Sequence, residues 1–227
     1  MARGKRWTRE ELLLAMNLYC RLPFGQMHAK NPRVQRLARS LDRTPGSVAM
    51  KLCNFAHLDP VERERGVKGL SGASKADRRV WNDFEEDWQG MAARSAELWM
   101  KRVSAANAEE EESNEESDTA EPDLTEVPDI PYSVETEGTA ERRVRLAQDM
   151  FRRAVLAAYD EACCISGNPV PELLVAGHIV PWSEDPTQRL NPRNGLCLSR
   201  LHEVAFDRGL ITLDEDLRLV VSGALKE

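Results

Sequence analysis

Hydrophobic positions recur at helical spacing soon after the start of the chain. The apolar positions that follow Trp7 are Leu12, Leu13, Ala15, Met16 and Tyr19. Such spacing is typical of one face of an α-helix. Thr8 is a suitable N-cap, and Glu11 stands three residues later, which is the spacing of a capping box. The pattern predicts a helix from residue 9 whose apolar face packs in a core.

Residues 31–57 show two more stretches of helical spacing with a break between them. The apolar positions of the first stretch are Val34, Leu37, Ala38 and Leu41, and those of the second are Val48, Met50, Leu52 and Phe55. The break is Asp42-Arg43-Thr44-Pro45. Two helices around a short turn resemble a helix-turn-helix, which presents its second helix to the DNA major groove. The resemblance implies that Ser47 and Lys51 face DNA and that Arg43 holds a phosphate; an ordinary helical hairpin with a basic face is the alternative.

The next helical stretch, residues 77–101, carries several aromatic residues. Trp81, Phe84 and Trp88 stand at intervals of three and four residues, so they share one helix face. We expect this face to close an N-terminal core, and the alternative is a platform on which bases stack.

Charge divides the chain into three segments. Residues 1–103 hold 20 Lys and Arg against 12 Asp and Glu, residues 104–141 hold none against 14, and residues 142–227 hold 11 against 12. The middle segment is rich in acid and contains Pro122, Pro128 and Pro131, so it buries too little apolar surface to fold and is predicted to be a disordered linker. The basic first segment is where a polyanion is expected to bind.

After the linker, Arg142–Tyr159 has the apolar spacing of a helix, and the pattern then changes. Leu173–Val180 is β-rich, the loop Pro181–Arg193 follows, and Asn194-Gly195 is expected to turn the chain into a second strand at Leu196–Leu198. Ser199 is a suitable N-cap for a short helix that ends at Gly209. The apolar residues available for its packing are Leu201, Val204 and Ala205. The predicted unit is strand, strand, helix, followed by a hairpin over residues 210–222.

Four motifs in this region resemble the HNH endonucleases. They are His178-Ile179-Val180-Pro181-Trp182, Asn191-Pro192-Arg193-Asn194-Gly195-Leu196, Leu198-Ser199 and Phe206-Asp207-Arg208-Gly209-Leu210. Each is a weak signal alone, but their order and spacing make the resemblance specific. It covers about the last third of the chain and implies a metal-dependent nuclease with a ββα-metal fold.

The resemblance implies catalytic roles for His178 and Asn194. Hydrolysis of a phosphodiester needs a base for the attacking water and a cation for the developing charge. A neutral imidazole accepts a proton at pH 7, so His178 suits the base. The amide of Asn194 suits a role in holding the loop near His178. In the same family a helix with the pattern of Arg145, Gln148, Phe151 and Arg152 precedes the nuclease unit, so Arg145 and Arg152 are expected to support the site or bind a phosphate.

The metal ligands are less clear from spacing. The family's metal-binding His usually lies nine residues after the Asn, and here that position is Glu203, with Asp207 four residues further on the same helix face. We therefore expect Glu203 and Asp207 to be ligands, with His202 as the rival. Gly177 stands where many members carry another ligand. An incomplete shell of oxygen ligands favours Mg²⁺ or Mn²⁺ over Zn²⁺.

The sequence therefore predicts an α+β chain of three parts: an all-α helix-turn-helix-like DNA-binding domain (residues 1–103), an acidic disordered linker (104–141) and a C-terminal HNH nuclease domain (142–227). DNA is the expected partner and substrate, and the family implies a 5′-phosphate product. A role in restriction or phage defence fits by analogy. The alternative is a DNA-binding regulator with a degenerate, non-catalytic HNH scaffold.

Composition narrows the remaining possibilities. There is no run of 18 apolar residues and no signal-peptide core, so no membrane association and a cytoplasmic location are expected. The five cysteines form no CxxC pair, which argues against a zinc ribbon and a disulfide framework. The oligomeric state stays open.

Overall fold

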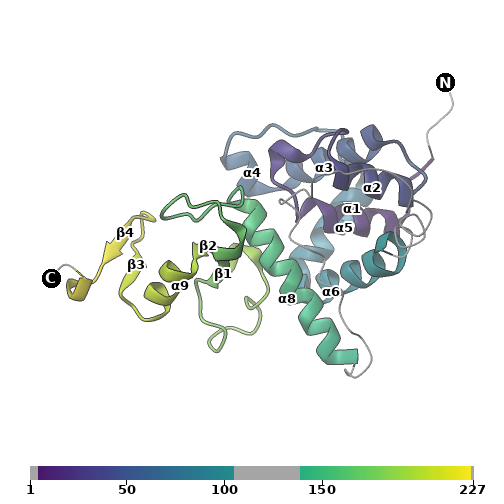
Figure 1. The fold of residues 1–227 in the computed structure, drawn as a ribbon. Helices are drawn as coiled ribbons and strands as arrows, with labels where there is room; N and C mark the ends of the chain where they lie inside the picture. Colours follow the sequence, from purple (N-terminus) through teal and green to yellow (C-terminus); the bar gives the residue numbers. More distant parts are fainter. Residues whose placement is uncertain (1–4, 105–138, 226–227) are drawn as a thin grey trace, which may run out of the picture. The chain divides into compact units, whose positions relative to one another are not determined.

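The structure is a computed structural model that describes residues 5–104 and 139–225. The chain divides into two compact units, Met1–Met150 and Phe151–Glu227, which are described separately below (Figure 1). The predicted linker lies almost wholly outside the described residues. Among the helices that the structure describes, none is long and apolar enough to cross a membrane.

The first unit is made of helices, as the sequence predicts (Figure 1). The helical stretch predicted over residues 77–101 is broken at Asp87, so Trp88 begins a new helix and does not share a helix face with Trp81 and Phe84. They are α1 (Arg9–Tyr19), α2 (Pro32–Ser40), α3 (Pro45–Leu58), α4 (Pro60–Glu64), α5 (Lys75–Glu86) and α6 (Trp88–Trp99), with short helical turns at Phe24–Gln26 and Met100–Ser104. The predicted N-terminus of α1 is confirmed, because Glu11 N donates to Thr8 Oγ1 and Thr8 N donates to Glu11 Oε2. Every residue of α1 from Glu11 to Tyr19 is buried, so α1 is the central helix of this unit.

The two predicted helices around the break are α2 and α3, and half of the residues of α3 are buried. Its buried residues are Val48, Ala49, Lys51, Leu52, Asn54, Phe55 and Ala56. The loop after α4 also lies on α3: Leu70 N donates to Cys53 O at 3.1 Å. A Cβ on Gly69 would stand 2.6 Å from His57 N. A recognition helix presents polar side chains to DNA, and these contacts cover part of α3, so its presentation to a groove stays a prediction.

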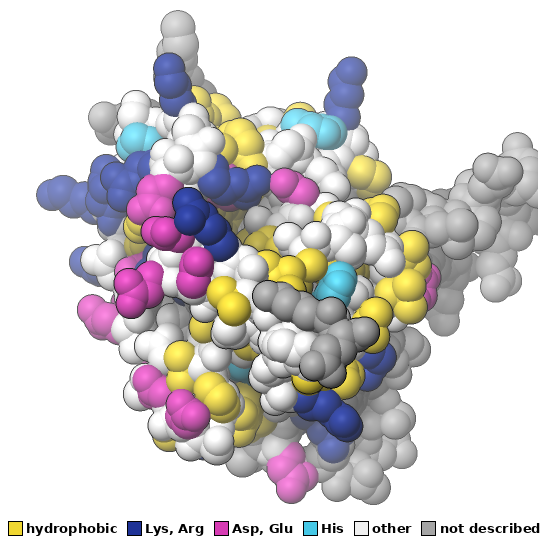
Figure 2. All heavy atoms as spheres, turned by 90° about the vertical axis from the view of Figure 1, so that its left-hand side faces the viewer, with side chains coloured by type: hydrophobic (Ala, Val, Ile, Leu, Met, Phe, Trp, Pro, Cys, Tyr) yellow, Lys and Arg dark blue, Asp and Glu magenta, His cyan; other side chains and the backbone are white. Residues whose placement is uncertain are grey.

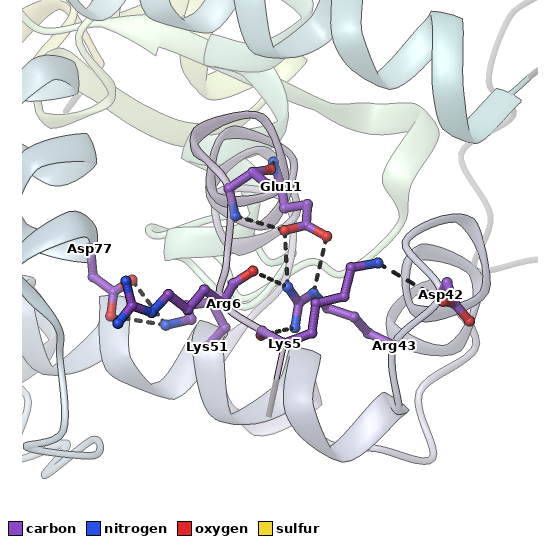
Figure 3. A network of polar contacts seen from close by, with 8 residues as sticks. Lys5, Arg6, Glu11, Asp42, Arg43, Lys51 and Asp77 are labelled. Carbon is purple, nitrogen blue, oxygen red and sulfur yellow. Dashed lines mark hydrogen bonds and ion pairs between the residues drawn. The ribbon is translucent and has the colours of Figure 1, made fainter. Parts of the chain in front are cut away.

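Arg43 lies in a buried ion pair instead of on a DNA-binding surface (Figure 3). Its Nη2 lies 3.0 Å from Glu11 Oε2, and the two side chains are only 6% and 3% exposed. The same guanidinium donates to the main-chain oxygens of Lys5 and Arg6 and lies over the Trp7 ring. Burial by itself raises the pKa of Glu11, but hydrogen bonds from Arg43 and Thr8 outweigh burial and lower it. Arg43 therefore ties the N-terminal arm to α1.

Lys51 is held in the same way (Figure 3). Its Nζ donates to both carboxylate oxygens of Asp77, at 2.9 and 3.0 Å, and lies 5.2 Å from the centre of the Trp7 ring. The Asp77 side chain is fully buried. A buried carboxylate needs a charged partner, so Lys51 neutralises Asp77 inside this unit, and a contact of Lys51 with DNA stays a prediction.

The boundary between the two units falls within α8 (Thr139–Ala158), which is the helix predicted over Arg142–Tyr159. The part up to Met150 belongs to the first unit. There Arg143 Nε lies 3.1 Å from Glu97 Oε1, and Asn17 Nδ2 lies 3.4 Å from Met150 Sδ. The part from Phe151 belongs to the second unit, where Arg152 Nη1 donates to Leu174 O at 2.9 Å.

The second unit contains the predicted strand, strand, helix order (Figure 1). Strands β1 (Leu174–His178) and β2 (Gly195–Ser199) are antiparallel, and His178 pairs with Gly195 at one end. Helix α9 (Arg200–Asp207) follows β2 directly, with Ser199 as its N-cap. The predicted C-terminal hairpin is confirmed as the antiparallel pair β3 (Ile211–Leu213) and β4 (Leu219–Val221).

Two local expectations in this unit are wrong. The chain turns at the short helical turn Pro192–Asn194, while Gly195 is extended at φ −123° and begins β2. A Cβ there would stand 2.3 Å from Val155 Cγ2, so the glycine permits close approach of α8. In α9, Leu201 is 76% and Val204 is 42% exposed, so these residues do not pack in the core of the unit.

Arg43→Ala should lower the free energy of unfolding by about 3–5 kcal/mol at pH 7, because it leaves the buried Glu11 carboxylate without its charged partner. Lys5→Ala is the matched control, since Lys5 pairs with Asp42 at 3.9 Å with both side chains exposed and such pairs contribute about 0–1 kcal/mol. Urea unfolding of the full chain measures both values. Equal losses in the two variants would contradict the role given to the buried pair.

The acid dependence gives a second readout of the same pair. The lowered pKa of Glu11 means that its stabilisation is present above the ordinary carboxyl pKa and is lost as the pH falls through the folded value. The difference between Arg43→Ala and the unaltered chain should therefore shrink in strong acid.

Candidate active site

His178 is the last residue of β1, and aromatic rings enclose it on two sides. The Phe151 ring stacks on it, with centroids 4.7 Å apart and planes 7° apart. The Trp182 ring meets it edge-on, with centroids 5.6 Å apart. Phe151 comes from α8 and Trp182 from the loop after β1, so three separate segments fix the plane of the imidazole.

One ring nitrogen of His178 has a defined partner. Its Nε2 lies 2.8 Å from the main-chain oxygen of Arg189. A carbonyl oxygen only accepts hydrogen bonds, so Nε2 carries the proton of the neutral ring. Nδ1 is then the nitrogen whose lone pair is available to accept a proton.

Asn194 closes the loop that begins after His178. Its Oδ1 accepts from Val180 N at 2.7 Å, and its Nδ2 donates to Val180 O at 3.1 Å and to Gln188 O at 3.3 Å. The residue is 6% exposed. Asn194 thus joins the start of the loop to its end, and the loop carries the Arg189 carbonyl that binds His178.

His202 is turned toward the N-terminus of its own helix. Its Nδ1 lies 3.0 Å from Ser199 Oγ and 3.3 Å from Cys163 Sγ. Burial by itself raises the pKa of the Cys163 thiol, but hydrogen bonds from Ser166 and His202 outweigh burial and lower the pKa to about 6. A thiolate at this position accepts a hydrogen bond from Nδ1–H, and Nε2 of His202 then keeps its lone pair.

Glu203 lies beside Gly177, the residue before His178. A Cβ added to Gly177 would stand 3.8 Å from Glu203 Cγ and 3.2 Å from Leu198 Cδ1. Successive residues of a strand point to opposite faces, so Gly177 faces α9 while His178 faces Phe151. Asp207 is exposed at the last turn of α9, four residues after Glu203. The glycine leaves the carboxylate of Glu203 room beside the end of β1.

The donor set fits a magnesium-like cation in part. Within residues 5–104 and 139–225, no three His, Cys, Asp or Glu side chains form a group able to hold a metal. A closed zinc site requires such a group. Mg²⁺ and Mn²⁺ prefer oxygen ligands, and Mg²⁺ commonly binds through one or two carboxylates together with water and substrate phosphate. Glu203, beside Gly177, is one such carboxylate. His202, the residue before Glu203 on α9, offers Nε2 as a nitrogen donor.

The expected DNA contacts separate into different environments. Ser47 is half-buried in the first turn of α3, and Arg43 and Lys51 are in the buried pairs described above. Arg152 donates to the backbone of Leu174 and so links α8 to β1, the strand that ends at His178. Arg145 is exposed. On the face shown in Figure 2, Lys and Arg side chains lie among Asp and Glu side chains. The net charge of a segment therefore does not by itself locate a phosphate-binding surface, and the expected contacts stay predictions.

Three contributors to this site were missed in the sequence. Phe151 was named only as a position of the family pattern, Trp182 only as part of the first HNH motif, and Cys163 only as one of five cysteines. Trp182 is 38% exposed. Each owes its role to a contact between segments distant in sequence. The one local signal was the position of Cys163 in a short Cys-Cys-Ile-Ser-Gly turn, where backbone and hydroxyl donors gather around a sulfur.

Comparison with known proteins agrees with this geometry. Residues 163–214 match the family model HNH_2, described as HNH endonuclease. The match begins at Cys163 and includes β1, β2, α9 and β3. It confirms the resemblance drawn from the motifs for this part of the chain. Neither curated proteins nor solved structures gave a match.

Asn194→Ala should abolish the protection of the Val180 amide against hydrogen exchange, because that amide donates to Asn194 Oδ1. The loss of a buried partner should also cost about 1–3 kcal/mol of unfolding free energy. Asn191→Ala is the matched control: Asn191 caps the neighbouring turn and bonds Gln188 Oε1 but not Val180. A protected Val180 amide in Asn194→Ala would show that another contact holds the loop.

Proposed function

We propose that this chain is a metal-dependent HNH endonuclease that hydrolyses phosphodiester bonds of DNA. The family match over residues 163–214 supports nuclease chemistry in general terms. The observation that carries the catalytic proposal is the bond between His178 Nε2 and the Arg189 carbonyl at 2.8 Å, since it leaves Nδ1 of a fixed imidazole free to take a proton.

In this proposal His178 is the general base. Nδ1 removes a proton from a water molecule as the water oxygen attacks the scissile phosphorus. The P–O3′ bond breaks to leave a 5′-phosphate and a 3′-oxyanion, which takes a proton from solvent water to become the 3′-hydroxyl. The Arg189 carbonyl accepts the Nε2–H bond throughout and stabilises the imidazolium that forms, because a hydrogen bond to the charged form favours it. Phe151 and Trp182 hold the ring in the plane in which Nδ1 meets the water.

The proposed ligands of the divalent cation are Glu203 and Asp207, with His202 Nε2 as the rival. When bound, the cation would neutralise the negative charge that develops on the phosphate. Glu203 lies next to the residue that precedes the base, so a carboxylate and the base lie at one end of β1. Cys163 and Ser199 hold the His202 ring by Nδ1, which is the arrangement of a histidine that binds metal through its other nitrogen.

The proposal extends to the whole chain. The first unit would bind the DNA backbone through exposed Lys and Arg outside the two buried pairs, and a restriction or defence role remains an analogy with the architecture. A non-catalytic DNA-binding regulator is the alternative function. Cleavage of plasmid DNA by the purified chain with Mg²⁺ or Mn²⁺, and its loss with chelator, distinguishes the two.

His178→Ala should reduce the rate of plasmid cleavage by about 10²–10⁴-fold, which is the usual contribution of a general base. Metal affinity should change little, because the residue is not a ligand in this proposal. His28→Ala, which alters an exposed histidine in the first unit, is the control for the loss of an imidazole. A His178→Ala protein that cleaves at the unaltered rate would exclude His178 as the base.

The ligand assignment is tested by comparing Glu203→Gln, Asp207→Asn and His202→Ala. If the carboxylates hold the cation, the first two variants should weaken Mn²⁺ binding in calorimetry and cleave only at raised metal concentration, while His202→Ala keeps its affinity. The opposite result, with affinity lost in His202→Ala and kept in Glu203→Gln, assigns the metal to His202 Nε2 and rejects the assignment from spacing.

A further inference from the structure

The loop between β1 and the turn Pro192–Asn194 contains a side chain that reaches back across it. Arg189 Nε donates to the main-chain oxygen of Trp182 at 2.6 Å. The guanidinium carbon of Arg189 lies 5.3 Å from the centre of the Trp182 ring, which is within the range of a cation–π contact. Arg189 therefore binds both the backbone and the ring of one residue seven positions earlier.

Both partners in this contact also touch the imidazole of His178. Trp182 meets the ring edge-on, and the Arg189 main-chain oxygen accepts from Nε2. The contacts form a closed circuit from His178 to the Arg189 backbone, along the Arg189 side chain to Trp182, and back to His178. Phe151 stacks on the imidazole as well. The position of the Arg189 carbonyl is thus linked to the position of its own side chain.

We propose that Arg189 is a positioning residue: its side chain, held on Trp182, keeps its own carbonyl at Nε2 of His178 and thereby fixes the tautomer that leaves Nδ1 unprotonated. The proposal rests on the proposed role of His178 as a general base, but the tautomer itself exists without substrate. Arg189 needs no contact with DNA for this effect.

Neighbouring anchors explain why the side chain is needed. Asn194 holds Gln188 O at 3.3 Å, and Leu190 is 4% exposed, so the end of the loop is anchored on either side of residue 189. The earlier part of the loop has local contacts, such as Glu184 N to Pro181 O. The Arg189 side chain joins Trp182 to this anchored end. Its removal frees the Trp182 ring, which meets the imidazole edge-on, so Nε2 of His178 and the anchored carbonyl can move apart.

The planar fork of Arg suits this task. Nε donates to the Trp182 oxygen while the guanidinium carbon lies over the indole ring. A Lys ammonium offers charge and three donors but no plane and no Nε. Arg189→Lys should therefore retain part of the effect, and Arg189→Met should keep the aliphatic cover of Trp182 but lose both the donor and the charge.

The test records the tautomer of His178 by long-range ¹H–¹⁵N NMR of the ring nitrogens in the full chain at neutral pH. The unaltered protein should show His178 as the Nε2–H tautomer with a slowly exchanging ring proton. In Arg189→Ala and Arg189→Met that proton should exchange quickly and the two tautomers should mix, with Arg189→Lys in between. Arg200→Ala, which removes an exposed arginine from the start of α9, is the control of equal charge and should keep the tautomer.

Cleavage is measured in parallel. With His178 mispositioned, kcat should fall by about 10–100-fold, as when a partner that orients a metal-binding histidine is removed, whereas KM should stay near the value in Arg200→Ala. A His178 ring that remains Nε2–H in both Arg189→Ala and Arg189→Met overturns the proposal, even if cleavage falls. If the Arg189 variants show mixed tautomers but the unaltered chain never cleaves DNA, the role of Arg189 as a positioning residue is supported and the proposed nuclease function is rejected separately. If Arg189→Ala does not fold, the His178 tautomer in Arg189→Met decides the outcome.

Discussion

The three hydrogen bonds of the buried Asn194 side chain are the constraint on which the candidate active site depends. Two short antiparallel strands bring His178 opposite Gly195, but the loop between them would otherwise be free to move at the residues that follow His178. Asn194 accepts from and donates to the backbone of Val180 and donates to Gln188. An amide is suited to this because it offers donors and an acceptor in one plane. The loop then carries the Arg189 carbonyl to the imidazole.

The first unit shows why net charge and phosphate binding are separate properties. Its sequence is basic, yet Arg43 and Lys51, which were both expected to contact DNA, are neutralised by Glu11 and Asp77 inside the unit. Breaking such a pair leaves a buried charge, whereas an exposed cation costs little to change. The pairs join the N-terminal arm and α3 to α1 and α5, so they define how the helices pack. Electrostatic attraction for a polyanion must come from other Lys and Arg residues.

Local patterns predicted much of the fold. The capping box of α1, the break between α2 and α3, the strand, strand, helix order and the final hairpin all follow from spacing and capping residues within a few positions. The errors arose where a neighbour far along the chain decides. Helical spacing alone could not show that Leu201 and Val204 face solvent, or that Gly195 serves the close approach of Val155 instead of a turn. Burial of α3 by a later loop was equally beyond its own sequence.

The same distinction between local pattern and distant contact applies to the candidate site. His178 and Asn194 stand in motifs that specify their backbone surroundings, so their places at the end of β1 and before β2 could be predicted. The orientation of each side chain could not. The His178 tautomer depends on a carbonyl eleven residues away, and the His202 ring direction depends on Cys163, which lies 39 residues earlier. Spacing on α9 puts Glu203 and Asp207 on one side of a helix, but the choice between carboxylate and imidazole depends on which nitrogen of His202 is already occupied. A motif therefore gives the identity and order of reactive groups, and contacts between distant segments decide which atom of each group is available to react.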